Sequence, residues 1–189
     1  MIYDNAKHLS LASLSDEIKE KIITINGVSK SYAMTGWRIG YAAGSEEIIK
    51  GMSNIQGHST SNPNSIAQKA SVEALKGKQD AIEEMRKAFD ERRKYMVKRL
   101  KEINGVTCLT PAGAFYAFPN IRKILDRGIE YNGKKIDNSF DLSCFILKEI
   151  EVALIPGSAF EAEGYLRLSY ATSMEDIKEG LDRLENLLK

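Results

Sequence analysis

One lysine and one arginine stand out in a stretch of small residues, NGVSKSYAMTGWRIGYAAG, at residues 26–44. Lys30 lies among serines, and Arg38 follows eight positions later, with a glycine two residues away on either side. A deprotonated lysine amine can form a Schiff base with an aldehyde, and an arginine fork can grip a phosphate through two oxygens. Glycines let the backbone come close to a ligand. The stretch therefore suits a carbonyl compound that also carries a phosphate.

Taken singly, Lys30 and Arg38 would be read as a surface lysine and a salt-bridged arginine in an ordinary loop. The whole string, however, resembles the lysine signature of class I and II aminotransferases, which use pyridoxal 5'-phosphate (PLP). The positions that match the signature are Gly27, Val28, Ser29, Lys30, Ala33, Met34, Gly36, Arg38, Ile39 and Gly40. The resemblance implies that Lys30 is the catalytic lysine that carries PLP, and that Arg38 binds the cofactor phosphate.

The chain departs from this family at Gly27, where many members have a serine that contacts the phosphate. Either the Gly27 backbone replaces that serine or another hydroxyl does. Ser29 and Ser31 are the candidates, although both could instead cap local backbone groups.

Two later stretches are similar to the same family: PAGAFY at residues 111–116, and PGSAF at 156–160 followed by RLSYA at 167–171. Arg167 interrupts an otherwise apolar segment, and an arginine in such a segment needs an anionic partner. The alternative is an edge strand on which Arg167 faces solvent. The resemblance implies that Arg167 binds the α-carboxylate of the substrate.

The other polar residues give weaker indications of a catalytic or binding role. The polar stretch at residues 56–63 corresponds in the family to a region near the dimer interface, although a plain surface loop explains it nearly as well. His8 and His58 are the only histidines, lack partners at metal-ligand spacing, and receive no catalytic role. Cys108 and Cys144 match no metal motif and are interpreted as reduced thiols. We therefore predict no metal site.

The hydrophobic pattern predicts a mixture of helices and short strands. Buried strands are expected at residues 22–26 and 40–44, and further strands at 106–109, 115–118, 152–155 and 166–170. Helices are expected from about 65 to 76, from 78 to 104, from 140 to 150, and after Ser173. The helix at 78–104 would be roughly 40 Å long, which suits a connection between two domains or a long surface helix. Its apolar stripe is Ile82, Met85, Phe89, Met96, Leu100 and Ile103.

The resemblance covers essentially the whole chain, but members of the family are much longer. It implies an α/β fold, namely the C-terminal part of the fold type I PLP-dependent transferase fold. Residues 1–76 would be the end of the large PLP-binding domain, and residues 77–189 the linking helix and small domain. The part that holds the acidic partner of the pyridine nitrogen would lie upstream.

Composition excludes some classes of partner. Lys and Arg total 27 and Asp and Glu total 26, so the net charge of +1 gives no basic surface for nucleic acid or anionic membranes. No apolar run reaches membrane-spanning length, and the first residues lack the pattern of a signal peptide. We therefore expect a cytoplasmic protein that binds neither nucleic acid nor membranes.

The resemblance implies transfer of an amino group between an amino acid and a 2-oxo acid by a homodimer that uses PLP. Aspartate is favoured as substrate because the match is best to bacterial and archaeal aspartate aminotransferases. Some branches bind a distal carboxylate with an arginine near residues 53–61, and this stretch has none, so alanine or aromatic donors stay open. The alternatives are a non-catalytic regulatory domain and a PLP lyase of the same fold. The chain alone is expected to be inactive.

Overall fold

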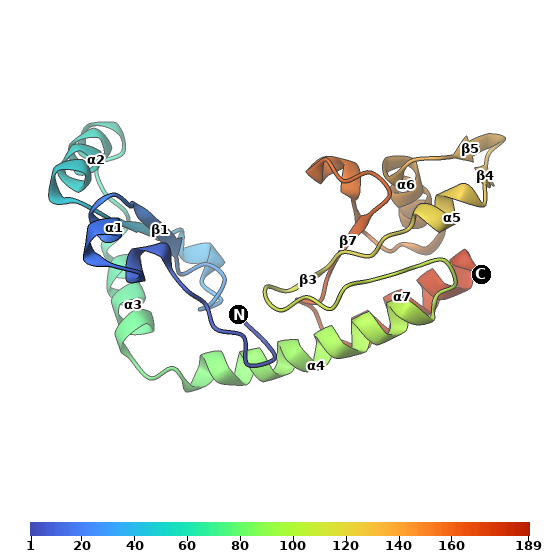
Figure 1. Ribbon diagram of the computed structural model, residues 1–189, viewed down its shortest axis with the longest axis horizontal. Coiled ribbons are helices and arrows are strands. Elements are labelled where there is room, and N and C mark those ends of the chain that lie inside the picture. Colours follow the sequence, from blue (N-terminus) through green and yellow to red (C-terminus); the bar gives the residue numbers. More distant parts are fainter. The chain divides into compact units, whose positions relative to one another are not determined.

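The computed structural model describes residues 1–189 and divides them into two compact units. Unit 1 consists of Met1–Asp4 and Arg86–Lys189, and unit 2 consists of Asn5–Met85. Helix α4 (Asp80–Glu102) begins in unit 2 and continues into unit 1 (Figure 1). The boundary between the units thus lies within the long helix, between Met85 and Arg86. The predicted boundary between the large and the small domain, between residues 76 and 77, stays a prediction. No helix combines the length and the apolar character needed to cross a membrane.

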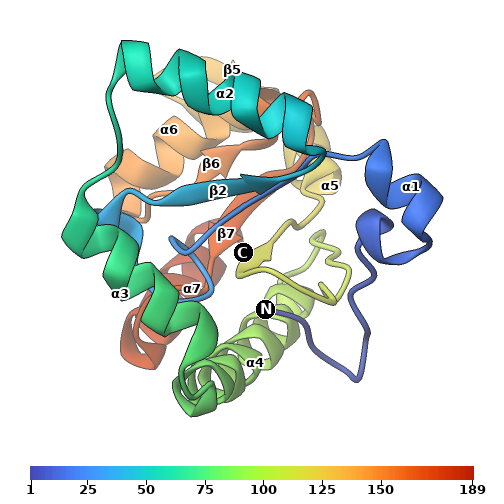
Figure 2. The same cartoon turned by 90° about the vertical axis from the view of Figure 1, so that its left-hand side faces the viewer.

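Unit 2 is built on a two-stranded antiparallel ribbon followed by two helices, α2 and α3, which an extended segment at residues 60–64 joins (Figure 2). Its elements are η1 (Leu11–Ser13), α1 (Asp16–Glu20), β1 (Thr24–Gly27), η2 (Thr35–Trp37), β2 (Gly40–Ala43), α2 (Glu46–Ser59) and α3 (Ser65–Lys76). In the ribbon, Thr24 pairs with Ala43 and Gly27 pairs with Gly40. Helix α3 begins where predicted because the Asn64 side chain accepts a hydrogen bond from the Ala67 amide.

The prediction that the two strands of unit 2 are buried is wrong. Ile25 in β1 is 77% exposed and Tyr41 in β2 is 39% exposed. A two-stranded ribbon has no neighbouring strands to cover its edges and little to cover its faces. Only the connection between β1 and β2 reaches a core, where Val28 and Ile39 pack with Ala67.

Unit 1 combines helices with a three-stranded antiparallel sheet in the order β3-β7-β6. Its elements after α4 are β3 (Tyr116–Ala117), α5 (Arg122–Asp126), β4 (Ile129–Tyr131), β5 (Lys134–Ile136), α6 (Ser139–Ile150), β6 (Ile155–Pro156), η3 (Gly157–Phe160), β7 (Leu166–Ser169) and α7 (Met174–Leu188). Helices α4 and α7 run side by side (Figure 1), and Arg99 of α4 forms ion pairs with Asp182 and Glu185 of α7.

The sheet of unit 1 has one buried face and one open face. Along β7, Leu166 and Leu168 are buried in the core with Ala117 of β3. Arg167 and Ser169 alternate with them and lie on the other face. The register places Ile155 opposite Arg167 on that open face. The core side is completed by α4, α6 and α7, whose buried residues include Met96, Val97, Leu100, Leu142, Ile146, Ile177, Leu181, Leu184 and Leu188.

The terminal helix confirms its prediction. The Ser173 hydroxyl accepts a hydrogen bond from the Asp176 amide at 3.0 Å, which caps α7 at its first turn. The buried residues of α7 recur every three or four positions along the helix and pack in the core of unit 1: Ile177, Leu181, Leu184 and Leu188. Helices α4 and α6 also lie within one or two residues of their predicted bounds.

The strands of unit 1 are shorter than predicted, and one is absent. Residues 106–109 form no strand and make only one isolated bridge, from Thr107 to Asn120. The hairpin β4–β5 was not predicted, although its turn carries the Asn132-Gly133 dipeptide. Both residues have positive φ, 50° and 72°, as a type I′ hairpin turn requires.

Candidate functional site

The loop that carries Lys30 and Arg38 is fixed at its base by a small core. The Val28 amide donates a hydrogen bond to the Ile39 carbonyl at 3.3 Å, and Val28 is fully buried. Within the loop, the Lys30 carbonyl accepts a hydrogen bond from the Ala33 amide at 3.1 Å. Both Lys30 and Arg38 are exposed. One loop of unit 2 therefore presents an amine and a guanidinium from the same anchored base.

Arg38 occupies an unusual backbone conformation. Its φ is 56°, in the left-handed region that few residues other than glycine adopt. Its Nη1 donates a hydrogen bond to the Thr35 carbonyl at 3.0 Å, which holds the side chain against its own turn. The remaining guanidinium donors make no hydrogen bond in unit 2 and are available to an anion.

The position of Gly27, where the chain departs from the family pattern, is closely packed in this loop. A Cβ at Gly27 would lie 3.1 Å from the Ile39 carbonyl oxygen, closer than ordinary contact. The Gly27 amide also donates to the Asn26 side-chain oxygen at 2.8 Å, so this backbone group is already engaged. Of the two replacements considered for the missing serine, the Gly27 amide thus already has a hydrogen-bond acceptor within the chain, and the hydroxyls of Ser29 and Ser31 stay candidates.

Arg167 lies on the open face of the unit 1 sheet between two aromatic rings. Its Cζ is 4.4 Å from the ring centroid of Tyr116 and 4.6 Å from that of Phe160. No carboxylate or carbonyl of unit 1 accepts a hydrogen bond from it. Strand β7 lies between β3 and β6, so the alternative of an edge-strand arginine is wrong. The neighbouring rings were not identified from the sequence as partners of Arg167.

A second arginine of unit 1, Arg93, is buried and fully paired. Its side chain is 1% exposed, and its Nη2 lies 2.7 Å from Asp4 Oδ1 and 2.6 Å from Asp90 Oδ1. Its Nη1 donates to the Pro111 carbonyl at 2.7 Å. The Tyr3 ring lies below the guanidinium, 4.5 Å from Cζ. Sequence reasoning missed this residue altogether.

The acidic partners of Arg93 respond to its charge. The hydrogen bond from Arg93 lowers the pKa of Asp4 below its ordinary value. Burial would raise the pKa of Asp90, but hydrogen bonds from Lys94 and Arg93 outweigh burial and lower it. Both carboxylates are therefore held in their charged forms around the guanidinium.

The first residues of the chain are tied to the PAGAFY segment next to Arg93. The Tyr3 amide donates to the Ala112 carbonyl, and the Ala114 amide donates to the Met1 carbonyl, each at 3.0 Å. The hydroxyls of Tyr3 and Tyr170 both donate to the Ala114 carbonyl, at 2.5 and 3.3 Å. Burial raises the pKa of both phenols. The segment is thus fixed from two sides before it enters β3.

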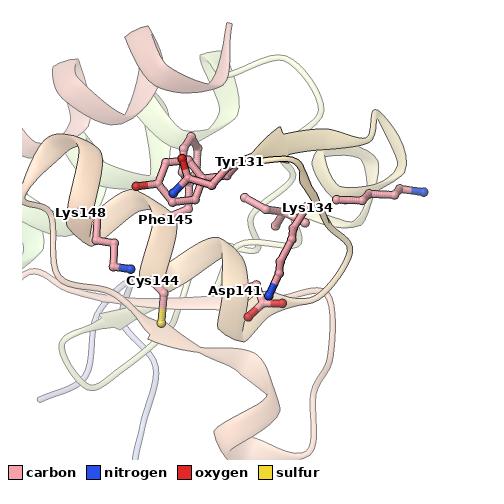
Figure 3. Close-up of a pocket in the computed structure, with 9 residues that line it drawn as sticks. Tyr131, Lys134, Asp141, Cys144, Phe145 and Lys148 are labelled. Carbon is pink, nitrogen blue, oxygen red and sulfur yellow. The ribbon is translucent and has the colours of Figure 1, made fainter.

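A cavity of about 340 Å³ lies apart from these residues, between the β4–β5 hairpin and α6 (Figure 3). Lys134 of β5 lines it, together with Asp141, Cys144 and Lys148 of α6. None of the residues that resemble aminotransferase motifs lines it. Cys144 and the buried Cys108 form no disulfide, and no three His, Cys, Asp or Glu residues group closely enough to hold a metal.

The predicted site residues thus fall in different units: Lys30 and Arg38 lie on one loop of unit 2, and Arg167 lies on the sheet of unit 1. Neither Arg38 nor Arg167 forms an ion pair with a carboxylate of its own unit, in contrast to Arg93 and Arg99.

Comparison with known sequences identifies relatives along the whole chain. The family model of aminotransferase class I and II matches residues 1–184. An aspartate aminotransferase of Streptomyces avermitilis is 47% identical over 188 residues, covering 100% of this chain and 46% of the relative. That of Bacillus subtilis is 46% identical over 189 residues, covering 100% of this chain and 47% of the relative. The chain thus spans about half the length of these relatives.

Solved structures give the same result for the fold. The aspartate aminotransferase of Rhizobium meliloti superimposes with a TM-score of 0.93 at 43% identity, over 99% of this chain and 46% of that one. The aromatic aminotransferase of Pyrococcus horikoshii superimposes with a TM-score of 0.88 at 43% identity, over 99% of this chain and 48% of that one. The mixed α/β architecture is therefore part of the aminotransferase fold, and the chain belongs to the family of class I and II aminotransferases.

Proposed function

We propose that the full-length protein transfers an amino group between an amino acid and a 2-oxo acid with PLP as cofactor. The observation that carries this proposal is the loop of unit 2, which presents Lys30 and Arg38 from one anchored base within a family-matching sequence. Aspartate is the favoured amino donor because relatives named aspartate aminotransferase match the whole chain. A relative named for aromatic substrates aligns nearly as well, so the side-chain preference needs a direct assay.

The donors of this loop fit PLP. An exposed amine suits its aldehyde, a guanidinium with unused donors suits its phosphate, and small residues leave room for both. When bound, PLP supplies an aldehyde that condenses with amines and a ring that accepts electrons. Ser29 and Ser31 would add hydroxyl donors to the phosphate. The acidic partner of the ring nitrogen would come from outside this chain.

In this mechanism Lys30 and Arg167 have different roles. Lys30 would hold the cofactor through its amine, and the same amine would accept a proton from the substrate α-carbon. Arg167 pairs with the substrate α-carboxylate and fixes its orientation. We further propose that the protein acts in the cytoplasm as a homodimer.

Borohydride reduction tests the role of Lys30. The full-length protein is incubated with PLP, reduced, digested and analysed by mass spectrometry. We expect the label on the peptide that contains Lys30. Lys50, which lies in α2 of the same unit, serves as the internal control and should stay unlabelled. A label on any other lysine would contradict the assignment.

The role of Arg167 is tested by kinetics in the full-length protein. Charge-assisted hydrogen bonds contribute about 1.5–3 kcal/mol each, so Arg167→Met should lower kcat/KM for amino acids at least about 100-fold. PLP binding, followed by its absorbance, should change much less.

Formation of 2-oxo acid with an amino acceptor distinguishes transamination from elimination. The isolated 189-residue chain should bind PLP weakly and show no transfer.

A further inference from the structure

The two aromatic rings around Arg167 have a function of their own, which rests on the proposed carboxylate role of that arginine. We propose that Tyr116 and Phe160 are positioning residues that hold the Arg167 guanidinium ready for the substrate carboxylate. These two rings form an aromatic clamp around the guanidinium. Its two rings lie 4.4 and 4.6 Å from the Arg167 Cζ.

The clamp arises from the register of the sheet. Tyr116 pairs with Ser169 across β3 and β7, so it lies on the open face, diagonal to Arg167 on the neighbouring strand. Phe160 ends η3, which follows β6 directly on the other side of β7. The two rings therefore reach Arg167 from the elements on both sides of its strand.

Each ring of the clamp is itself in contact with another aromatic residue. The Tyr116 ring centroid lies 4.4 Å from that of Phe115, and the Phe160 centroid lies 6.1 Å from that of Phe118 in an edge-to-face arrangement. Such pairs restrict the motion of the rings. The two rings that contact the guanidinium are therefore themselves held by aromatic contacts.

The chemistry of the contact leaves the arginine available for an anion. A ring attracts the cation through its π electrons, so the contact occupies no N–H donor of the guanidinium. An ion pair would order the side chain equally well but would neutralise it, as at Arg93. A long arginine side chain loses much rotamer freedom when it binds, and ordering it in advance lowers that cost.

Nuclear magnetic resonance tests the clamp without requiring activity. In the labelled 189-residue chain, ring currents should shift the Arg167 δ protons upfield of those of Arg38, for which the structure gives no ring contact. Phe160→Leu should remove part of this shift and Phe160→Tyr should keep it. Phe145→Leu, which alters an aromatic pair with Tyr131 elsewhere in unit 1, is the matched control and should leave the shift unchanged.

Kinetics of the full-length protein test the positioning role. Loss of one ring, in Tyr116→Leu or in Phe160→Leu, should raise the KM for the amino acid about 5-fold, with kcat within about 2-fold, as expected for one cation–π contact. Tyr116→Phe and Phe160→Tyr should restore the KM because they keep a ring. Circular dichroism should show that the Leu variants remain folded.

The outcomes separate this proposal from the proposed function. Unshifted Arg167 δ protons would overturn the clamp, and so would an unchanged KM in both Leu variants or equal losses in the ring-keeping variants. If Arg167→Met itself leaves the KM unchanged while the ring-current shifts are present, the carboxylate role fails and the positioning role fails with it. Absence of any transfer activity would overturn the proposed function, and the spectra would still decide whether the clamp exists.

Discussion

The two arginines of unit 1, Arg93 and Arg167, have opposite surroundings although both contact aromatic rings. Arg93 is buried and bound by two carboxylates and a carbonyl. Arg167 is half-buried, with two rings and no carboxylate partner in its unit. A buried cation must be paired with an anion to offset the cost of its desolvation. A cation that is to bind a ligand anion must instead have no carboxylate of its own chain as a partner. The comparison therefore predicts that the groups an arginine contacts, more than its burial, distinguish a structural role from a binding role.

The strongest test of this comparison removes the charge of Arg93. Arg93→Met leaves Asp90 and Asp4 without their buried cation, and we expect the free energy of unfolding of the chain to fall by about 2–4 kcal/mol. Thermal unfolding followed by circular dichroism measures the change. Trp37, the only tryptophan, lies in unit 2, so its fluorescence reports the other unit separately.

Lys94→Met is the matched control, because Lys94 pairs with the same Asp90 but is 62% exposed. Exposed ion pairs contribute little, and we expect a loss below about 0.5 kcal/mol. Equal losses in the two variants would show that burial of the Arg93 pair contributes nothing extra.

Acid should remove the same stabilisation. Asp4 and Asp90 have pKa values lowered below 3.8, so their contribution is fully present above that pH and is lost as pH falls through their folded-state values. The stability difference between wild type and Arg93→Met should therefore stay constant from about pH 7 to about pH 5 and shrink below about pH 4. A difference that is unchanged at the lowest pH at which both proteins remain folded would argue against the ion pairs as its source.

A smaller effect is expected from the tyrosine beneath Arg93. Tyr3→Phe removes the hydrogen bond to the Ala114 carbonyl but keeps the ring under the guanidinium. Since Tyr170 still donates to that carbonyl, the loss should be about 1 kcal/mol. Tyr41→Phe in unit 2 is the control and should be neutral. A neutral Tyr3→Phe would mean that the Tyr170 hydroxyl satisfies this carbonyl alone.

The smallest effect on stability should come from Arg167 itself. Arg167→Met removes two cation–π contacts on a half-buried surface, and we expect the free energy of unfolding to change by less than about 1 kcal/mol. The same thermal unfolding measurement as for Arg93→Met determines this change. A loss as large as that of Arg93→Met would make Arg167 a structural residue and would end the contrast between them.

The sequence predicted a role for Arg167 but none for Arg93. Arg167 was predicted to bind a carboxylate because a family pattern surrounds it, and this role stays a prediction. Arg93 was missed, although it occupies the apolar stripe of α4 between Phe89 and Met96, at the spacing of a core position. A charged residue on such a stripe signals a buried pair, but its partners Asp4 and Pro111 are distant in sequence and could not be inferred from helical periodicity.

Elements with strong local signals were predicted well, and elements that depend on neighbours were not. Helices α4, α6 and α7 follow from periodicity and capping residues. The burial of β1 depends on what covers the ribbon, and Ile25 was misjudged for that reason. The clamp depends on register, which brings Tyr116 and Phe160 beside Arg167 from 51 and 7 residues away in sequence.

The tie between the first four residues and the Arg93 cluster makes unit 2 an insertion within unit 1. The backbone passes from one unit to the other twice, after Asp4 and after Met85. A chain shortened to begin at Arg86 would lack Tyr3 and Asp4 and would leave Arg93 with one carboxylate and an uncovered face. A short peptide with the sequence of the first residues should bind such a shortened chain in trans, and the two could then be studied as a split protein.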